Sequence, residues 1–523
     1  MSQTTNPNAL NYQTAPNAQR LLWAGFVAIL AAGIGFSVRG ASVLGAWSEA
    51  FGFTQTELGG ITGGGLVGFG IVIIISSFLA EAIGYARLLY FAFGVHFLSA
   101  VVTLAAPAVF AAAGKDATYW TLYVGMFLFA IGNGVCEAVV NPLTATLFPN
   151  NKTHYLNILH AGWPAGLILG GVASIFMAGV VSWEIQISLF LIPVVIYGLM
   201  IFGQKMPQTD ASAAGLSFLQ VLAQFAAPML LFLLFIHAMV GYVELGTDSW
   251  IARITGSILN ENTGRWLFVY TSALMFILRF VAGPIVHKIS PLGLLLVSAI
   301  LASFGLYFLG GVNTTLAALA ALTIYGLGKT FFWPTMLAVV SERFPKGGAV
   351  TLGMVGGVGM LSAGLLGGPG IGFKQDKFAS EKLQDISPDT FERYRAGQEN
   401  RFLAFSTNGL DGQKVATLND DGKTLTNDLA LLRERGDRSD NLENLGEWWN
   451  SAEAKAESDK QPVIDATLHG SRMALKLTAI VPATMAICYL ILIAYFRTIG
   501  GYKALTIHEE AEEAALETPG SEM

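Results

Sequence analysis

Residues 132–149 read "GNGVCEAVVNPLTATLFP" and place a glutamate, Glu137, inside a long apolar segment. An ionised carboxylate at the centre of a membrane span costs several kcal/mol, roughly 2.5–3.5 on insertion scales. Such a residue faces the interior of a helix bundle, where a paired cation or a function offsets the cost. The stretch therefore predicts a membrane-spanning helix with a polar inner face.

The composition of the chain supports a membrane protein. Its 523 residues are 53% hydrophobic and 13% charged, whereas soluble domains average about 25% charged residues. About half of the charged residues fall between Phe373 and Gly470, and the rest of the chain is almost free of charge. This pattern predicts a polytopic membrane protein with one polar insertion.

Charge and motif content argue against several function classes. The net charge of −6 comes partly from the acidic C-terminal stretch and suggests no nucleic-acid partner. Cys136 and Cys488 lie in apolar runs, so we expect neither a disulfide framework nor a metal site. The sequence carries no Walker loop and no nucleophile–base set. We therefore expect no enzyme and no cofactor, and transport would draw on an ion or substrate gradient.

Long apolar runs recur along the chain. A spanning helix needs about 20 mostly apolar residues, and twelve segments qualify. They predict an all-α polytopic membrane protein with twelve transmembrane helices. The segments are 21–47, 57–82, 87–112, 119–147, 155–180, 185–204, 222–251, 264–287, 292–311, 315–341, 348–371 and 473–496.

The basic residues of the short loops predict the orientation, because Lys and Arg are enriched on the cytoplasmic side. Both termini are then cytoplasmic and residues 373–470 are external, in a plasma or inner membrane. The inner loops hold Arg20, Arg87, Lys152, Lys205, Lys288, Arg343, Lys346, Arg497 and Lys503, and the outer short loops hold only Lys115, Arg253 and Arg265.

An internal repeat relates the two halves of the chain. Residues 326–345, "GLGKTFFWPTMLAVVSERFP", resemble 132–149 in having an internal proline and a final Phe-Pro. Glu137 lies five residues before Pro142, and Lys329 lies five before Pro334. The repeat predicts two pseudo-symmetric halves of six helices. The expected domains are a disordered tail 1–20, the first half 21–204, a cytoplasmic linker 205–217, helices 7–11 in 218–372, the external insertion 373–470, helix 12 in 471–497 and an acidic cytoplasmic tail 498–523.

This organisation resembles the major facilitator superfamily over the whole chain apart from the insertion. The superfamily's loop between spans 2 and 3 has a degenerate copy in "FLAEAIGYARLL", where Glu81 stands in place of the usual Asp. The resemblance implies transport by alternating access, a central cavity lined by spans 1, 4, 7 and 10, and a gating role for Glu81.

Charged residues inside the spans fit that cavity. All of them except Arg279 in span 8 lie on the four cavity helices, and they are Arg39, Glu137, Glu244, Asp248 and Lys329. Helical spacing adds polar and aromatic neighbours on the same faces. These are Asn133 and Asn141 on span 4, Asn157 and His160 on span 5, His237 and Gly241 on span 7, and Tyr325 and Trp333 on span 10.

Several of these residues have two interpretations. Glu137 is either a permanently paired ion, with Lys329 or Arg39 as its partner, or a carboxylate that takes up protons or contacts substrate. Arg279 is a structural or a gating cation. His160 is a packing residue or part of the site, and Trp333 either stacks on a sugar ring or packs in the core.

Span 4 is similar to the fourth span of the fucose–proton symporter family. That family's Gly-x-Gly-x-x-Glu-x-x-x-Asn-Pro pattern is present at Gly132, Gly134, Glu137, Asn141 and Pro142. The next span continues with "LNILH", where His160 replaces a Gln, and span 7 carries Gly241, Glu244 and Trp250 at similar places. The resemblance implies that Glu137 serves sugar recognition or proton coupling. Span 1 departs from the family, since it carries Arg39 where the family has an acidic residue.

Three function hypotheses follow. The first is a monomeric secondary transporter that moves a small polar solute, a sugar, with protons or another coupling ion across the lipid bilayer. The second is an organic-anion exchanger or facilitator that uses Arg39 and Lys329, because two cavity cations suit an anionic substrate. The third is a membrane sensor whose insertion binds a ligand.

The insertion has helical signals of its own. The stretch "SPDTFERYRAGQE" at 387–399 begins with a Ser-Pro cap, and "TLTNDLALLRERG" at 424–436 ends in Gly. Trp448 and Trp449 predict an exposed aromatic surface. We expect a small external cap, remote from spans 1, 4, 7 and 10.

Overall fold

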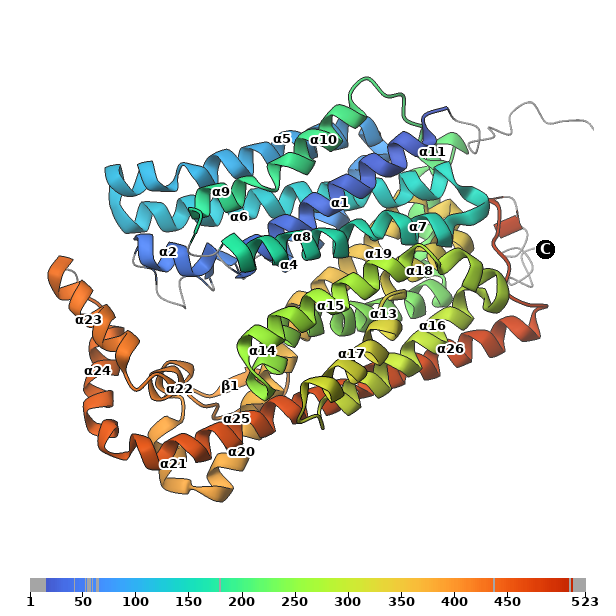
Figure 1. Cartoon of the computed structure of the whole chain (residues 1–523). Helices are drawn as coiled ribbons and strands as arrows, with labels where there is room; N and C mark the ends of the chain where they lie inside the picture. Colours follow the sequence, from blue (N-terminus) through green and yellow to red (C-terminus); the bar gives the residue numbers. More distant parts are fainter. Residues whose placement is uncertain are drawn as a thin grey trace, which may run out of the picture.

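The computed structural model describes residues 16–510 apart from positions 42, 52, 54–57, 59, 63–64, 178–179, 436–437 and 508. The expected disordered tail 1–20 lies mostly outside these residues. The described chain is almost entirely helical. Figure 1 shows two groups of roughly parallel helices, one above the other, with α1 to α10 in the first group and α13 to α20 together with α25 and α26 in the second.

The first group contains the Glu137 stretch in its longest helix, α6. Its helices are α1 (Ala18–Ala41), α2 (Val43–Phe51), α4 (Gly65–Ile83), α5 (Tyr85–Leu104), α6 (Ala106–Leu147), α7 (Lys152–His160), α8 (Gly162–Met177), α9 (Trp183–Ser188) and α10 (Leu191–Ile201). Short helices α11 (Asp210–Ala213) and α12 (Phe218–Ala223) form the connection to the second group.

The second group begins at a proline and contains two short π-helical segments. Its elements are α13 (Pro228–Gly241), η4 (Tyr242–Gly246), α14 (Thr247–Ile258), α15 (Glu261–Arg279), α16 (Ala282–Leu309), α17 (Thr315–Lys329), α18 (Phe332–Arg343), η5 (Pro345–Gly347), α19 (Gly348–Ser362), η6 (Ala363–Gly367), α20 (Gly368–Ile386), α25 (Ala456–Thr478) and α26 (Ile480–Thr498). A connecting turn η2 (Pro149–Asn151) joins α6 to α7 in the first group.

Eleven helices within the described residues are long and apolar enough to cross a membrane. They match the expected segments except 264–287, where α15 ends at Arg279 and a break at Phe280 and Val281 separates it from α16. The chain is therefore a multi-pass membrane protein, and the count of twelve spans stays a prediction. The expected loop between spans 3 and 4 is a reversal at Gly114, whose φ of 78° favours glycine.

Several helix pairs join the two groups, and α18 against α7 and α19 against α6 are among them. Helix α19 lies against α4, and α15 lies against α8. A side chain on Gly70 of α4 would meet the backbone of Gly357 on α19, so glycine lets these two helices approach closely. The small residues of the apolar spans therefore hold the groups together.

Residues 373–470 form a folded unit at one end of the bundle, which we call the cap (Figure 1). Helices α20 and α25 pack together and connect the cap to the bundle. Between them lie α21 (Pro388–Tyr394), a two-stranded antiparallel hairpin of β1 (Asn400–Phe402) and β2 (Phe405–Thr407), α22 (Gly412–Asn419), α23 (Lys423–Arg435) and α24 (Asp440–Ala452). Both helical signals of the insertion are confirmed in α21 and α23.

The cap has its own small core. Leu383, Phe391, Tyr394 and Leu418 are buried in it together with Trp449. The expected aromatic surface is thus wrong for Trp449, because an apolar ring of that size stabilises a small domain far more when it is buried.

An ion pair between the half-buried Arg393 and the buried Asp459 reinforces the cap. The carboxylate of Asp459 accepts hydrogen bonds from Arg393 at 2.8 and 2.5 Å and from Thr390 at 2.9 Å. The two-pronged geometry matches the guanidinium fork, and Arg393 thereby ties α21 to α25. The Trp448 indole N–H donates a hydrogen bond to the Arg393 backbone oxygen at 3.2 Å, so Trp448 also packs against α21.

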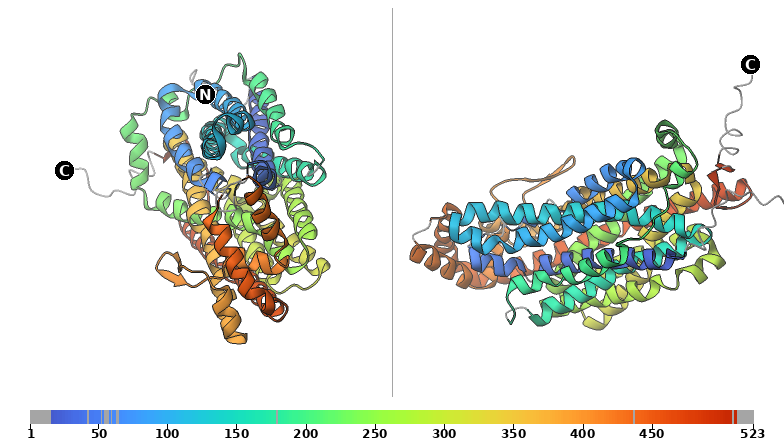
Figure 2. Two further views of the ribbon diagram at one scale, coloured as in Figure 1. Left: turned by 90° about the vertical axis from the view of Figure 1, so that its left-hand side faces the viewer. Right: turned by 90° about the horizontal axis from the view of Figure 1, so that it is seen from above.

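The cap is attached to span 7, contrary to the expectation that it is remote from the cavity helices. The Trp250 indole N–H of α14 donates to the Gly368 oxygen at 2.9 Å, and Lys374 donates to the Tyr242 hydroxyl at 2.9 Å. The reason is that α20 continues η6 and α19 beyond the bundle and so runs alongside α14. We call this end of the bundle the cap end. The opposite end, which holds residues 16–18 and 502–510, is the tail end (Figure 2).

Candidate functional site

The polar face of α6 lies in the centre of the molecule. All residues from Gly132 to Leu147 are buried, and so are all residues from Phe332 to Arg343 in α18. The tail-end halves of spans 4 and 10 are thus closely packed against other helices rather than lining open space. The polar groups that they carry must find partners in the protein.

Glu137 begins a chain of hydrogen bonds within the first group. Its carboxylate Oε2 accepts a hydrogen bond from Asn141 Nδ2 at 2.7 Å. The Asn141 carbonyl Oδ1 lies 2.8 Å from His160 Nε2, so that nitrogen carries the proton it donates. The expected shared face of Glu137 and Asn141 is confirmed. The cross-helix bond to His160 joins α6 to α7.

Arg279 joins the two groups at this point. It is 1% exposed. Its Nη1 donates to the His160 backbone oxygen at 2.5 Å, and its Nε donates to the Thr330 backbone oxygen at 3.0 Å. Its Nη2 pairs with the Glu244 carboxylate at 2.8 Å. One guanidinium therefore binds α7 in the first group and both span 7 and span 10 in the second.

Two prolines explain why those backbone oxygens are available. In a helix the oxygen of residue i accepts from the N–H of residue i+4, and proline has no N–H. Pro164 lies four residues after His160, and Pro334 lies four residues after Thr330. Each proline thus frees one carbonyl, and Arg279 takes both.

Glu244 lies in the π-helical segment η4 of span 7. Besides Arg279 it accepts a hydrogen bond from the Trp333 backbone N–H at 3.2 Å. Single π-turns occur frequently at functional sites because they shift the side chains that follow. The extra residue in this turn alters the face that His237, Gly241, Glu244 and Asp248 would share on a regular helix.

Lys329 pairs with Asp248, not with Glu137. The Lys329 ammonium donates to Asp248 Oδ1, with side chains that are 0% and 9% exposed. The Tyr325 ring centroid lies 5.3 Å from the ammonium. The expected pairing of Glu137 with Lys329 is therefore wrong, because span 7 places a nearer carboxylate beside span 10. Glu137 has Arg279 as its electrostatic neighbour.

This arrangement predicts which charges are energetically coupled. In double-mutant cycles of Lys329→Met with Asp248→Asn, we expect a coupling energy of about 1–3 kcal/mol, because the partners are in contact. Lys329 and Glu137 have no hydrogen-bond or ion-pair partner in common among the described residues, so Lys329→Met and Glu137→Gln should be additive to within about 0.5 kcal/mol. Thermal unfolding in detergent measures both cycles. Strong coupling between Lys329 and Glu137 would contradict the assignment of partners.

Arg39 is separate from this network. Its guanidinium carbon lies 4.0 Å from the Phe129 ring centroid and 4.5 Å from that of Phe190. In the described part of the chain its Nε, Nη1 and Nη2 have no hydrogen-bond partner. The alternative pairing of Glu137 with Arg39 is thus also wrong in this structure.

Other predicted site residues have different partners. Asn133 Oδ1 lies 2.9 Å from His96 Nε2, and His96 Nδ1 lies 3.0 Å from the Tyr197 hydroxyl. Asn157 donates to the Thr153 oxygen at 2.8 Å and to the Thr335 hydroxyl at 3.3 Å, so it contacts the second group instead of the network.

Besides His160, two more buried histidines lie in this region; the sequence placed His237 on the polar face of span 7, whereas His96 was missed. One is His96, which holds Asn133 in place. The other is His237, whose ring lies 4.6 Å from the Trp333 ring and has no hydrogen-bond partner on either nitrogen among the described residues. The signal was a lone histidine within an apolar run, at "FGVHFLSA" in span 3 and "LLFIHAMV" in span 7. Trp333 is 4% exposed and packs in the core here.

The tail end is held closed by hydrogen bonds between the groups. Lys152 donates to the Ser341 oxygen at 2.9 Å, and the Thr153 hydroxyl donates to Glu342 at 3.1 Å. Glu81 accepts from the Thr209 hydroxyl and from the Ala349 N–H at 3.3 Å. Glu81 thus links span 2 to the linker and to span 11.

The linker contributes a second carboxylate to the same region. Thr146 at the end of α6 donates to Asp210 at 2.8 Å. Burial raises the pKa of Asp210, and the nearby Lys152 and the bond from Thr146 oppose that rise. The linker is therefore packed into the tail end.

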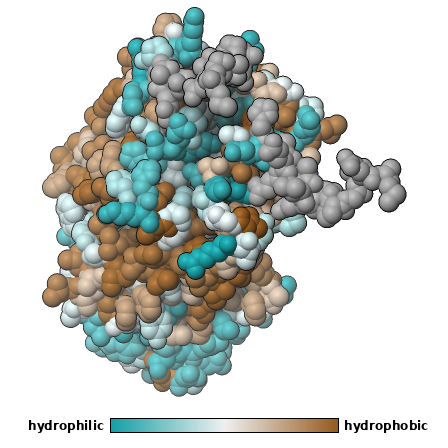
Figure 3. All heavy atoms as spheres, turned by 90° about the vertical axis from the view of Figure 1, so that its right-hand side faces the viewer, coloured by the Kyte–Doolittle hydropathy of each residue, from teal (hydrophilic) through white to brown (hydrophobic). Residues whose placement is uncertain are grey.

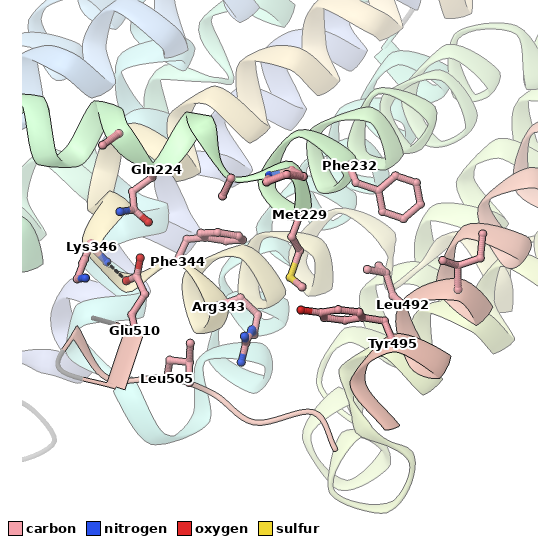
Figure 4. A pocket seen from close by; sticks show the side chains of 14 residues that line it. Gln224, Met229, Phe232, Arg343, Phe344, Lys346, Leu492, Tyr495, Leu505 and Glu510 are labelled. Carbon is pink, nitrogen blue, oxygen red and sulfur yellow. Dashed lines mark hydrogen bonds between the residues drawn. The ribbon is translucent and has the colours of Figure 1, made fainter. Parts of the chain in front are cut away.

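The C-terminal segment covers the tail end from outside. The Tyr502 hydroxyl donates to Glu342 at 2.7 Å, and the Lys346 N–H donates to Glu510 at 2.8 Å. A pocket of about 530 Å³ lies beside these contacts. In Figure 4, Lys346 and Glu510 lie on one side of it and Phe232 and Leu492 on the other. Figure 3 shows hydrophilic residues gathered over this end and hydrophobic surface on the flanks. None of the central network residues lines this pocket.

Comparisons with known proteins place the chain among membrane transporters. The family model described as the Major Facilitator Superfamily matches residues 24–368. No curated protein sequence gives a significant match. Among solved structures, the transporter FucP in its outward conformation is 18% identical with a TM-score of 0.57, covering 69% of this chain and 92% of FucP.

Two further structures have the same fold. One is the E. coli fucose:proton symporter FucP in a variant form, which matches with the same identity, TM-score and coverage. The other is the proton:xylose symporter XylE bound to 6-bromo-6-deoxy-D-glucose, at 14% identity and a TM-score of 0.55, covering 66% of this chain and 87% of XylE. At these identities the similarity shows the fold.

Proposed function

The chain belongs to the major facilitator superfamily and is a transporter rather than an enzyme, and from that premise we propose that it moves a sugar-like solute together with protons by alternating access. The observation that carries the proposal is the buried chain from Glu137 through Asn141, His160 and Arg279 to Glu244. This chain of contacts crosses from the first helix group to the second, and its end in the first group is the Glu137 carboxylate, which can bind a proton.

Alternating access requires that contacts between the halves break and reform. In this proposal the two helix groups are the six-helix halves of a twelve-span transporter. Protonation of Glu137 removes the negative charge that faces Arg279. Arg279 then keeps its bonds to Glu244 and to the His160 backbone oxygen but loses the electrostatic attraction to Glu137, which weakens its hold on the first half. Glu81, between span 2 and span 11, acts as a second gating residue at the tail end.

The orientation and the state of the molecule belong to the same proposal. The basic short loops favour a cytoplasmic tail end, which makes the cap external. The hydrogen bonds between the halves at the tail end then close the cytoplasmic side. In this proposal the structure represents an outward-facing state. The transporter acts as a monomer in the plasma or inner membrane.

Sugars are the proposed solute class because the named neighbours are sugar symporters. FucP is a fucose:proton symporter and XylE is a proton:xylose symporter. The test is uptake of labelled L-fucose, D-xylose and related sugars into proteoliposomes, with and without an inward proton gradient. Gradient-stimulated uptake supports the proposal. Uptake that ignores the gradient for every solute in the panel contradicts proton coupling.

The cap is expected to be dispensable for this transport. Replacing residues 378–466 with a short Gly/Ser linker should leave a folded protein with measurable uptake. The contacts of Trp250 and Lys374 with their partners lie outside the deleted segment, and Gly470 packs against the backbone of Gln375 where the linker rejoins. Loop closure adds only a logarithmic cost. Complete loss of uptake in a correctly inserted deletion variant would show that the cap takes part in transport.

A further inference from the structure

Arg39 is a buried cation with no counter-ion among the residues that the structure describes. It is 1% exposed, and none of its three guanidinium nitrogens has a hydrogen-bond partner among the described residues. The faces of Phe129 and Phe190 lie 4.0 and 4.5 Å from the guanidinium carbon. Such cation–π contacts are weaker than the penalty of burying an ion, so they offset it only in part.

The other charges of the central region are matched. Arg279 pairs with Glu244, and Lys329 pairs with Asp248. This leaves one cation, Arg39, and one carboxylate, Glu137. They have different neighbours, because Glu137 bonds to Asn141 and faces Arg279. The six charges sum to zero when Glu137 is ionised and to one positive charge when it is protonated.

Other titratable groups lie near these two residues, and each has a neutral form: the imidazoles of His160 and His96 without an extra proton, and the thiol of Cys136 with its proton. His160 reaches Glu137 through Asn141, Cys136 precedes Glu137 in the chain, and His96 lies near Arg39. None of them adds a carboxylate. A proton on Glu137 therefore leaves the charge of Arg39 uncompensated by the protein.

We infer that the transported solute is an anion, a sugar acid, whose carboxylate binds the Arg39 guanidinium beside Phe129 and Phe190 while Glu137 holds a proton. This inference rests on the proposed proton-coupled transport and specifies its substrate. A guanidinium fork binds a carboxylate through two parallel hydrogen bonds. The flanking rings offer apolar faces to a sugar ring. Because the rings cover the guanidinium in this structure, one of them must turn aside when the solute binds.

Charge balance gives this assignment a mechanistic reason. The empty carrier has Arg39 and ionised Glu137, which together are neutral. The loaded carrier has Arg39 with the carboxylate and a protonated Glu137, which are also neutral. A neutral sugar would instead leave one unpaired positive charge in the low-dielectric interior during the transition, which is costly. One proton and one anion enter together, and no covalent bond changes.

The test compares D-galacturonate with D-galactose, which differ only by the carboxylate. Full-length protein in proteoliposomes is given an inward proton gradient, with the membrane potential clamped at zero or imposed. We expect uptake of D-galacturonate or D-gluconate that exceeds D-galactose uptake at least about 10-fold, since a hydrogen bond to a charged group is worth about that factor. The uptake should not respond to the imposed potential.

Variants at Arg39 test its role directly. Arg39→Gln should lower sugar-acid uptake about 10-fold or more, and Arg39→Lys should retain part of it. Arg265→Gln is the matched control, because Arg265 is exposed and, among the described residues, pairs with the also exposed Glu261 on α15. The melting temperature of the ligand-free protein is a second readout. If Arg39 awaits an anion, Arg39→Gln should raise this temperature, whereas a purely structural cation would make it fall.

The outcomes separate this inference from the proposed function. Proton-driven, potential-sensitive accumulation of D-galactose with no preference for the acid would overturn the inference and leave proton-coupled sugar transport intact. Undiminished acid uptake by Arg39→Gln would also overturn it. Absence of gradient-driven uptake for both the acids and the neutral sugars in the panel would count against the proposed function itself.

Discussion

Glu137→Gln should lower the gradient-driven accumulation of solute by about 100-fold or more. This is the largest functional effect that we expect of a single substitution. The amide keeps the size of the side chain and its contact with Asn141, but it can neither bind a proton nor carry the negative charge that faces Arg279. General acid–base groups typically contribute 10²–10⁴-fold to the steps that depend on them. Uphill uptake in proteoliposomes under an imposed pH gradient measures the effect.

Exchange of solute across the membrane without a gradient provides the control. If Glu137 serves only proton coupling, counterflow in Glu137→Gln should continue at a rate near that of the native protein. If it also contacts the solute, both processes should fail. Undiminished uphill uptake by the variant would contradict any coupling role for Glu137.

Removal of one partner from the pair of Arg279 and Glu244 is expected to cause the largest loss of stability. Arg279→Met leaves a buried carboxylate with one hydrogen bond from the Trp333 N–H, and it also leaves the freed oxygens of His160 and Thr330 without their donor. Breaking a buried ion pair in this way costs about 3–5 kcal/mol. We expect low yield and a markedly lower melting temperature in detergent.

A double variant distinguishes the cost of an unpaired buried charge from the cost of the lost contact. Arg279→Met with Glu244→Met removes both ions, so it should recover much of the melting temperature lost in either single variant. Transport should not recover, because the contact that links α7 to spans 7 and 10 is absent. Additive losses in this cycle would show that the pair is not energetically coupled.

Much of the fold follows from the sequence, because a bilayer demands long apolar helices. Apolar length alone identified segments that match all eleven candidate spans. The segment 264–287 fell short because Arg279 and the break after it divide the apolar run between α15 and α16. Residue spacing also found the contact between Glu137 and Asn141, since residues four apart share a helix face.

The contacts between different helices could not be predicted from residue spacing. Spacing cannot say whether Lys329 meets Glu137 or Asp248, since that depends on how spans 4, 7 and 10 pack. The π-turn at Glu244 also shifts its side chain away from the regular face. One usable signal was in the sequence. Pro164 and Pro334 mark two backbone oxygens that need a donor, and a buried arginine on a third helix is well suited to supply it.

Helix α20 continues directly from α19 and η6, so a tilt of these helices inside the bundle also moves the cap. The 19 residues of α20 extend about 28 Å at a rise of about 1.5 Å per residue. A tilt of about 10° at the base of a rod of that length would displace its far end by about 5 Å. Movements too small to follow inside the bundle would therefore be amplified outside it. A fluorophore on the cap would report the cycle of the carrier, and a binder that immobilised the cap would slow it.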